Sequence, residues 1–149
     1  MPRLKPKASP SPPALIGWRE HVLLPELGLG PLIAKIDTGA RSAALHAEDI
    51  HVQGHRVRFV VPVNGRNHQC EALVRGQRRV KSTSGHSEAR MVIETPIVIG
   101  KHRLTAEITL TDRTDMGVPM LLGRAAIRGR FIVHPGRTFL VSASARKKK

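Results

Sequence analysis

The segment AKIDTGARSAALHA, residues 34–47, places an acidic residue at the exit of an apolar strand. Asp37 supplies a carboxylate, Thr38 offers a hydroxyl that can lock the turn, and Gly39 lets backbone N–H groups approach closely. Two such carboxylates held face to face cannot both ionise, so they share one proton. One can then act as a base toward water while the other acts as an acid toward a carbonyl group. Taken alone, however, Asp-Thr-Gly is more often only a strand-to-turn signal.

A second motif, PMLLGRAAI, occupies residues 119–127. The pair of motifs resembles the retroviral-type aspartic proteases, in which an apolar-apolar-Gly strand passes behind the Asp-Thr-Gly turn and a following Arg is tied to the loop after it. The matching residues here are Leu121, Leu122, Gly123 and Arg124. The resemblance implies that these four residues support the turn, and that Asp37, Thr38 and Gly39 form the catalytic element.

The resemblance extends over residues 16–141. The segments IGWREHVLLPELGL, AKIDTGARSAALHA, GHSEARMVIETPIVIG and EITLTDRTDMGVPMLLGRAAIRGRFIVHPGRTFL look like the bacterial family labelled ATP-dependent zinc proteases, which is viewed as a retropepsin-like domain. The family has an Asp before the Pro near the end, where this chain has His134. The resemblance implies an aspartic-type peptidase.

The segments that must position these motifs alternate apolar and polar residues with the period of two that is typical of β-strands. In HRLTAEITLT, apolar Leu104, Ala106, Ile108 and Leu110 alternate with Thr105, Glu107, Thr109 and Thr111, which predicts a strand with one wet face. RVRFVVPV predicts a second such strand, with Val57, Phe59, Val61 and Val63 on one face, and TFLVS near the C-terminus is a further candidate.

With the resemblance, these strands predict an all-β fold. We expect a closed six-stranded barrel of the acid protease (retropepsin-like) type, with one short helix at Arg124–Arg128 after LLGR. The expected domain covers residues 14–144, between a disordered basic Pro/Ser-rich arm at 1–13 and a basic tail at 145–149.

Neither part of the label "ATP-dependent zinc" has a matching motif. The sequence has no GxxxxGK[ST] phosphate loop and no HExxH. The best metal candidates are His86 and Glu88, two residues apart on one strand face, joined by His46. A hydrogen-bonding or substrate-positioning role suits them better, so we predict no metal site and no cofactor, with zinc left open and any ATP dependence assigned to a partner.

The single Asp-Thr-Gly triplet predicts a homodimer in which each subunit contributes Asp37 across a two-fold axis. A monomer would instead need Asp37 to work with another group, such as His86 or Glu88. The segment VKSTSGHSEAR, residues 80–90, reads as a hairpin flap with a turn at Ser84 and Gly85.

The flap carries Lys81, His86 and Arg90, and Arg41 follows the turn; these cations suit an anionic peptide. We therefore assign Arg41, His86 and Arg90 to substrate binding, together with Glu88 as a hydrogen-bonding or positioning group. The alternative is that these side chains are solvated strand faces. The family's association with an ATP-grasp enzyme that adds glutamates to a ribosomal protein implies a poly-glutamate tail as substrate.

The formal net charge of +14 arises partly in the tails, which carry seven of the 25 cations. All 11 carboxylates lie between the tails, so the body carries a net +7. This charge attracts anions, and a non-catalytic ribosome- or nucleic-acid-binding module is the rival function, with a metal-dependent hydrolase as the third. No apolar run reaches the length of a membrane span, and no signal peptide is recognisable, so we expect a cytoplasmic protein without membrane contact. Cys70, the only cysteine, is interpreted as a buried apolar residue rather than a nucleophile.

Overall fold

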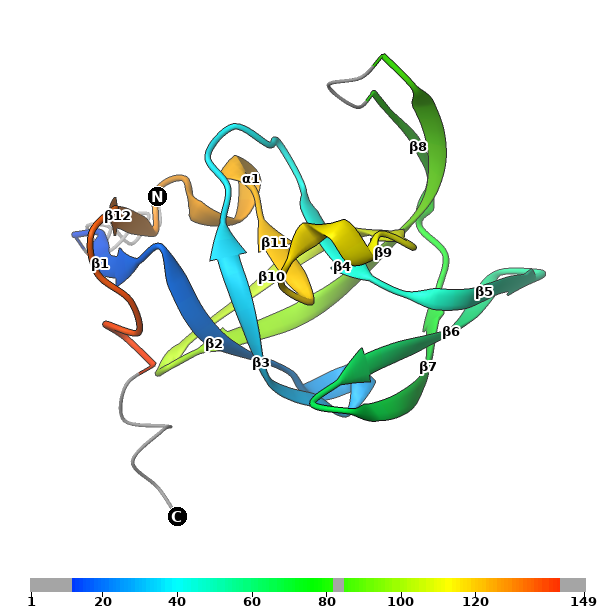
Figure 1. Cartoon of the computed structure of the whole chain (residues 1–149), viewed down its shortest axis with the longest axis horizontal. Coiled ribbons are helices and arrows are strands. Elements are labelled where there is room, and N and C mark those ends of the chain that lie inside the picture. Colours follow the sequence, from blue (N-terminus) through cyan, green and yellow to red (C-terminus); the bar gives the residue numbers. More distant parts are fainter. Residues whose placement is uncertain (1–11, 82–84, 143–149) are drawn as a thin grey trace, which may run out of the picture.

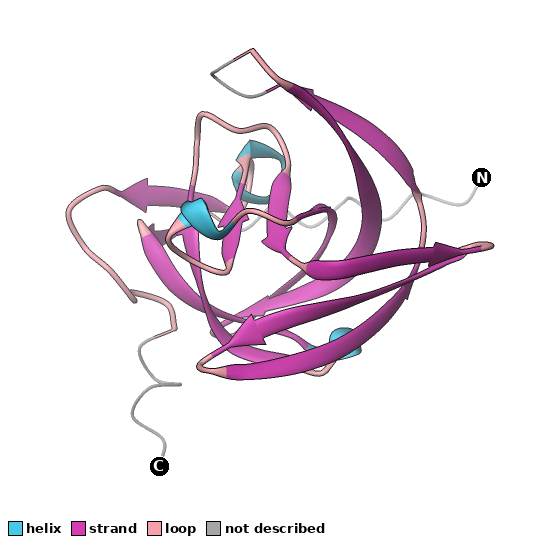
Figure 2. Ribbon diagram, turned by 45° about the vertical axis from the view of Figure 1, so that its right-hand side comes forward, coloured by secondary structure: helices cyan, strands magenta, loops and turns pink. Residues whose placement is uncertain are grey.

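A computed structural model of the chain describes residues 12–81 and 85–142, and Figures 1 and 2 show its all-β architecture. The strands are β1 (Ala14–Gly17), β2 (Arg19–Leu24), β3 (Leu29–Ile36), β4 (Ala43–His46), β5 (Glu48–Gln53), β6 (Arg56–Val63), β7 (Arg66–Leu73), β8 (Gly76–Lys81), β9 (Ser87–Ile99), β10 (His102–Thr111), β11 (Met120–Leu122) and β12 (Phe131–His134). Two 3-10 turns, η1 (Pro25–Leu27) and η2 (Thr114–Met116), join strands.

The α-helix found in the described residues is α1 (Arg124–Ile127), which directly follows β11 at the expected place. It is four residues long, and no helix within residues 12–81 and 85–142 has the length and apolarity needed to cross a bilayer. Residues 1–11 of the expected N-terminal arm and the expected tail at 145–149 lie outside the described residues.

The central element is a closed barrel of six strands, hydrogen-bonded in the order β10-β4-β11-β3-β2-β9, with β9 pairing back to β10. β8 adds to this sheet beside β9 and forms a hairpin with it. Closure leaves no free edge within the ring of six strands. The expected all-β, closed six-stranded barrel of the retropepsin-like type is confirmed.

Two smaller sheets complete the fold. β5, β6 and β7 form an antiparallel sheet that lies to the right of the barrel in Figure 1, and β1 pairs in parallel with β12. The apolar face predicted for β6 is confirmed, because Val57, Phe59, Val61 and Val63 are all buried. This face joins the three-stranded sheet to the core of the barrel.

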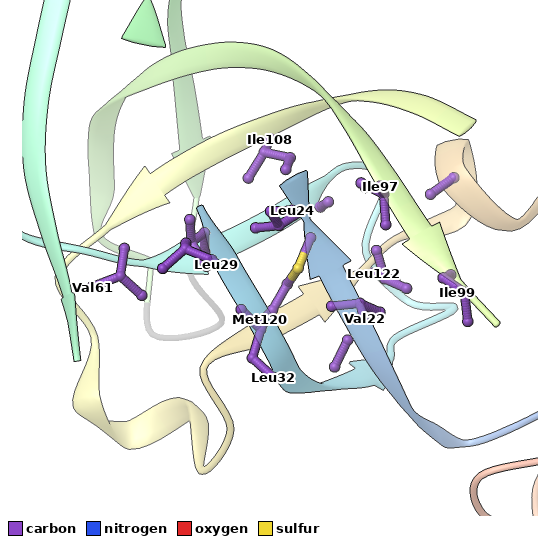
Figure 3. Close-up of a cluster of buried hydrophobic side chains, with 14 of the residues drawn as sticks. Val22, Leu24, Leu29, Leu32, Val61, Ile97, Ile99, Ile108, Met120 and Leu122 are labelled. Atoms are coloured by element: carbon purple, nitrogen blue, oxygen red, sulfur yellow. The ribbon is translucent and has the colours of Figure 1, made fainter. Parts of the chain in front are cut away.

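The barrel interior is filled by aliphatic side chains from every side of the ring, and Figure 3 shows part of this cluster. Val22 and Leu24 come from β2, Ile97 and Ile99 from β9, Ile108 from β10, and Met120 and Leu122 from β11, all with 0% exposure. Burial of each such side chain contributes roughly 1.5–3 kcal/mol. The short strand β11 is therefore held in place by packing as well as by hydrogen bonds to both neighbours.

The prediction of a fully wet second face on β10 is wrong at its C-terminal end. Thr105 and Glu107 are exposed, but Thr109 and Thr111 are each only 1% exposed. Both hydroxyls make contacts with other strands, and that of Thr111 donates to Glu88 of β9 at 3.4 Å. Thr109 donates its hydroxyl proton to the carbonyl of Ala43 at 3.2 Å, which satisfies the buried hydroxyl.

The strand predicted at TFLVS is also wrong, because residues 138–142 adopt no regular structure. They are held instead by the carboxylate of Glu20, which is fully buried on β2. Glu20 accepts hydrogen bonds from the backbone N–H groups of Leu140 and Ser142 at 2.8 and 3.0 Å, and from the Ser142 hydroxyl at 2.6 Å. A buried charge therefore replaces strand pairing as the anchor of this segment.

Candidate active site

Asp37 lies directly after β3, half-buried, in a turn that holds it through both backbone and side chain. Its N–H donates to the Leu122 carbonyl at 2.8 Å, and its carbonyl accepts from the Ala40 N–H at 3.1 Å. Its carboxylate Oδ1 accepts from the Gly39 N–H at 3.0 Å. A Cβ added at Gly39 would lie 3.3 Å from that same oxygen, so the missing side chain leaves room for the carboxylate.

Thr38 takes part in this turn through its backbone. Its side chain is exposed, and the hydroxyl makes no hydrogen bond with the part of the chain that the structure describes. Its carbonyl instead accepts a 2.9 Å hydrogen bond from Nη1 of Arg124. The side-chain lock expected at Thr38 is replaced by this bond to the backbone.

β11 and the start of α1 support the turn from behind, in the arrangement that the two motifs imply. β11 lies between β3 and β4, parallel to β3 and antiparallel to β4. A Cβ at Gly123 would lie 2.5 Å from the Ser42 carbonyl oxygen and 2.8 Å from that of Ala40, so only glycine fits. The Arg124 N–H also donates to the Ala40 carbonyl at 2.8 Å. Leu122 is fully buried, while Leu121 is half-buried at the cleft described next.

A cleft of about 840 Å³ opens at the Asp37 turn. Figure 1 shows the β8–β9 hairpin rising on the same side of the barrel as the loop that joins β3 to β4. The cleft is bordered by that loop, by β8 and the start of β9, and by the buried end of β10. Residues 82–84 of the predicted flap tip lie outside the described residues, but the β8–β9 pairing that flanks them is that of a hairpin.

Positive charge dominates the described lining of this cleft, in which Asp37 is the one acidic residue. The lining cations are Arg41, Arg78, Arg79, Lys81, Arg90 and Arg113. Arg78 pairs with Glu107 at 2.6 Å, and Nη1 of Arg79 donates to the Ser87 hydroxyl at 3.2 Å. Arg41 and Lys81 are exposed and form no ion pair with the described residues. The cleft is therefore an electropositive depression around a single carboxylate.

The other residues assigned to substrate binding lie at and just before the start of β9, in the β8–β9 hairpin. Arg90 lines the cleft and is only 7% exposed. Its Nε donates to Oε1 of Glu88 at 3.0 Å, and the Thr111 hydroxyl donates to Oε2 of Glu88 at 3.4 Å. His86 is exposed near the hairpin tip, and neither His86 nor Glu88 is part of the cleft lining.

A separate polar group forms where β4 ends. Ligand atoms of His46, Glu48 and Asp112 lie within 4.8 Å of one another, and they are the candidate metal group among the described residues, in place of His86 with Glu88. Nδ1 of His46 accepts the Arg113 N–H at 3.0 Å, so the proton resides on Nε2, which lies 2.9 Å from Glu48. A metal ion on Nε2 would require the ring proton on Nδ1, opposite another N–H. The donor set therefore fits a hydrogen-bonded chain and does not fit a metal ion.

Sequence reasoning missed Arg78 and Arg79 as cleft residues and Glu48 as the partner of His46. The signal for the arginines was the segment QRRVK immediately before the predicted flap. Both faces of β8 carry cations there, an unusual pattern for a strand that packs on a barrel. The signal for Glu48 was its spacing of two residues from His46, the same spacing that was noted for His86 and Glu88.

Comparisons with known proteins agree with this geometry. A family model described as the retropepsin-like aspartic endopeptidase RimB matches residues 15–144. A solved crystal structure, that of protein Lpg0085 of Legionella pneumophila, superposes with a TM-score of 0.73, and the protein is described as being of unknown function. The two chains are 34% identical, and the match covers 87% of this chain and 98% of that one.

Curated relatives carry a different name. Proteins named probable alpha-L-glutamate ligase from Shewanella halifaxensis (strain HAW-EB4) and Desulfotalea psychrophila (strain LSv54 / DSM 12343) are 36% and 37% identical over 133 and 129 residues. These matches cover 84% and 81% of this chain but only 29% and 28% of the relatives, so the chain spans less than a third of their length. The matched family model covers nearly all of the described fold, and the chain belongs to the RimB-like family of retropepsin-like aspartic endopeptidase domains.

Proposed function

We propose that this chain is an aspartic-type peptidase that hydrolyses peptide bonds in acidic, glutamate-rich peptides. The observation that carries the proposal is the position of Asp37, a half-buried carboxylate fixed in a braced turn at the edge of a cleft lined by cations. The membership in a family of retropepsin-like endopeptidase domains supports the same reaction class.

The proposed mechanism needs two carboxylates, and the chain supplies one Asp-Thr-Gly turn. We propose that two copies of the chain bring their Asp37 residues together across a two-fold axis. The ionised carboxylate takes a proton from water as the water oxygen bonds to the scissile carbonyl carbon. The protonated carboxyl gives its proton to the carbonyl oxygen. Collapse of the tetrahedral intermediate then breaks the C–N bond, and the amine leaves with a proton.

The substrate class follows from the charge of the cleft. The cleft lining contains several guanidinium groups and an ammonium group, and each can form a charge-assisted hydrogen bond with the carboxylate of a substrate glutamate. The relatives named probable alpha-L-glutamate ligase carry a domain like this one within a longer chain, which supports a substrate made of linked glutamates. We therefore propose poly-glutamate tails as the natural substrate, acted on in the cytoplasm, where the single cysteine would stay reduced.

Substitution of Asp37 by Asn tests the reaction. Hydrolysis of a synthetic hexaglutamate-containing peptide, followed by mass spectrometry, should slow by at least about 100-fold in Asp37→Asn. Asp49→Asn is a matched control, because Asp49 is exposed, lies outside the cleft lining, and has a φ of 50° that asparagine tolerates. The control should stay within about twofold of the wild-type rate. Equal loss in both variants, or none in either, would exclude Asp37 as the catalytic group.

The rival function, binding of nucleic acid without catalysis, draws on the same cationic cleft. It predicts that affinity for single-stranded RNA falls steeply and linearly with the logarithm of salt concentration, and that Asp37→Asn leaves this affinity intact. The peptidase predicts cleavage of the glutamate peptide that persists in the presence of excess RNA at moderate salt. Full competition by RNA together with no peptide cleavage would favour the rival.

A further inference from the structure

Arg90 differs from the other cations of the cleft in its burial. It is 7% exposed, whereas Arg41, Arg79 and Lys81 are exposed or half-exposed. It lies on β9, opposite Arg78 of β8 in the antiparallel register. Arg78 forms an ion pair with Glu107 at 2.6 Å, whereas Arg90 pairs with Glu88, so the two neighbouring guanidinium groups have separate carboxylate partners.

Glu88 fixes Arg90 through one side of the guanidinium group. Nε donates to Oε1 of Glu88 at 3.0 Å, and Thr111, which is 1% exposed, donates to the other carboxylate oxygen at 3.4 Å. The hydrogen bonds of the Arg90 side chain within residues 12–81 and 85–142 involve Nε alone, and neither Nη donates to a described residue. Arg90 lines the cleft, and its two Nη atoms are not among the fully buried, unpartnered polar atoms of the described residues, so they are free to donate to a ligand in the cleft. A guanidinium group held in this way has a planar, pre-set geometry that matches a carboxylate.

We propose that Arg90 is the specificity-determining residue of the cleft, binding the side-chain carboxylate of a substrate glutamate and rejecting glutamine at the same position. The inference rests on the proposed peptidase function for its biological meaning, although it concerns binding alone. A site built around a fixed donor pair on a largely buried side chain discriminates strongly, because a substrate without the matching acceptor leaves those donors poorly paired. Exposed cations cannot discriminate in this way, since water and salt ions solvate them with any ligand.

The exposed cations Arg41, Arg79 and Lys81 have a different role in this account. They raise the local concentration of anionic peptide and speed association, and salt screens their effect. The contribution of Arg90 should persist better at high salt, because its own side chain is 7% exposed and is held by hydrogen bonds rather than by long-range attraction. Salt dependence therefore separates the two kinds of positive charge.

The test compares equilibrium binding of fluorescein-labelled hexaglutamate and hexaglutamine peptides by fluorescence anisotropy, at about 0.5 M NaCl, where exposed charges are screened. All proteins carry Asp37→Asn so that no peptide is cleaved. The ratio of the two dissociation constants should fall by about 10- to 100-fold in Arg90→Gln, the range expected for a hydrogen bond to a charged group. Lys35→Gln is the control, because Lys35 is an exposed cation of β3 outside the cleft lining, and its ratio should stay within about threefold.

A second variant separates a loss of glutamate preference from a loss of the folded structure. Arg90→Lys keeps the positive charge beside Glu88 but lacks the planar fork, so it should retain the fold and still lose part of the glutamate preference. An unchanged ratio in Arg90→Gln and Arg90→Lys, with melting temperatures like that of the parent, would overturn the inference. So would a parent protein that binds both peptides equally. Failure of the peptidase proposal looks different: the protein with Asp37 intact would leave hexaglutamate uncut while the preference for it, and its loss in Arg90→Gln, remained measurable.

Discussion

The backbone N–H of Asp37 donates a 2.8 Å hydrogen bond to the carbonyl of Leu122, so a strand from the far end of the chain fixes the candidate catalytic residue. Leu122 is fully buried and ends β11, which lies between β3 and β4. The rigidity of the turn therefore depends on the barrel core rather than on the Asp-Thr-Gly triplet alone. Substitutions in β11 or at the corner after it should therefore displace the Asp37 turn, even though the Asp-Thr-Gly triplet itself is unchanged.

Gly123→Ala tests this dependence. The new Cβ would lie 2.5 Å from the Ser42 carbonyl oxygen, so the corner between β11 and α1 must move. We expect a loss of about 1–3 kcal/mol in the free energy of unfolding, measured by guanidinium denaturation, together with slower peptide hydrolysis. Gly136→Ala is the control, because its nearest contact would be an ordinary 3.4 Å to the His134 ring. Equal stability of the two variants would show that the corner is not tightly packed.

Glu20→Gln should weaken the attachment of the C-terminal segment. The substitution keeps the shape of the side chain but places an NH2 group where the carboxylate accepts N–H and hydroxyl donors from Gly17, Leu140 and Ser142. We expect a loss of about 1–3 kcal/mol or more in the free energy of unfolding, because Glu20 is fully buried. Glu26→Gln, at an exposed residue of η1, should change stability by less than about 0.5 kcal/mol. Stability of Glu20→Gln within the range of this control would contradict the assigned role.

The same carboxylate predicts an acid sensitivity. Burial by itself raises the pKa of Glu20, but the hydrogen bonds from Ser142, Gly17 and Leu140 outweigh it and hold the pKa below its usual value of 4.5. A depressed folded-state pKa contributes stability that is present above pH 4.5 and is lost as the pH falls toward the folded-state value. Denaturation midpoints measured between about pH 6 and pH 3 should therefore fall more in the wild type than in Glu20→Gln. Parallel curves for the two proteins would refute this assignment.

Cys70 should be nearly unreactive in the folded protein. It is 6% exposed, and burial raises the pKa of its thiol from 9.0 to about 11. At pH 8 the thiolate fraction is then about 100-fold lower than for the unshifted thiol. Reaction with a disulfide reagent such as Ellman's should be slow in native buffer and fast in guanidinium. Rapid native labelling would mean that β7 opens readily or that the thiol is accessible.

Much of this fold was predictable from local pattern. The alternation of Val57, Phe59, Val61 and Val63 predicted the buried face of β6. The family resemblance carried by the Asp-Thr-Gly and Leu-Leu-Gly motifs implied which strand passes behind the turn. Burial of one face gives a strand a hydrophobic period of two, which is visible in the sequence. A tight corner has no room for a Cβ, as at residue 123, so it requires a glycine that is also visible in the sequence.

The predictions that were wrong all concern residues whose environment is set by contacts with segments distant in the sequence. Thr109 and Thr111 look like solvent-facing residues in the sequence, yet both are buried and their hydroxyls bond to Ala43 and Glu88, which are distant in the chain. Residues 138–142 look like a strand, yet they are tied to Glu20, more than a hundred positions earlier. The one local hint was that Glu20 shares a strand face with Val22 and Leu24, an acidic residue at an apolar position. The burial of Arg90 was likewise invisible from its neighbours alone.

The most direct test of the central claim mixes active and inactive subunits. Wild-type protein is incubated with an increasing excess of Asp37→Asn at constant wild-type concentration, and hydrolysis of the glutamate peptide is measured after subunit exchange. If each active site needs Asp37 from two copies, an equal amount of variant should lower the activity to about half, and a large excess should abolish it. Activity that stays constant at every ratio would contradict the shared pair of carboxylates.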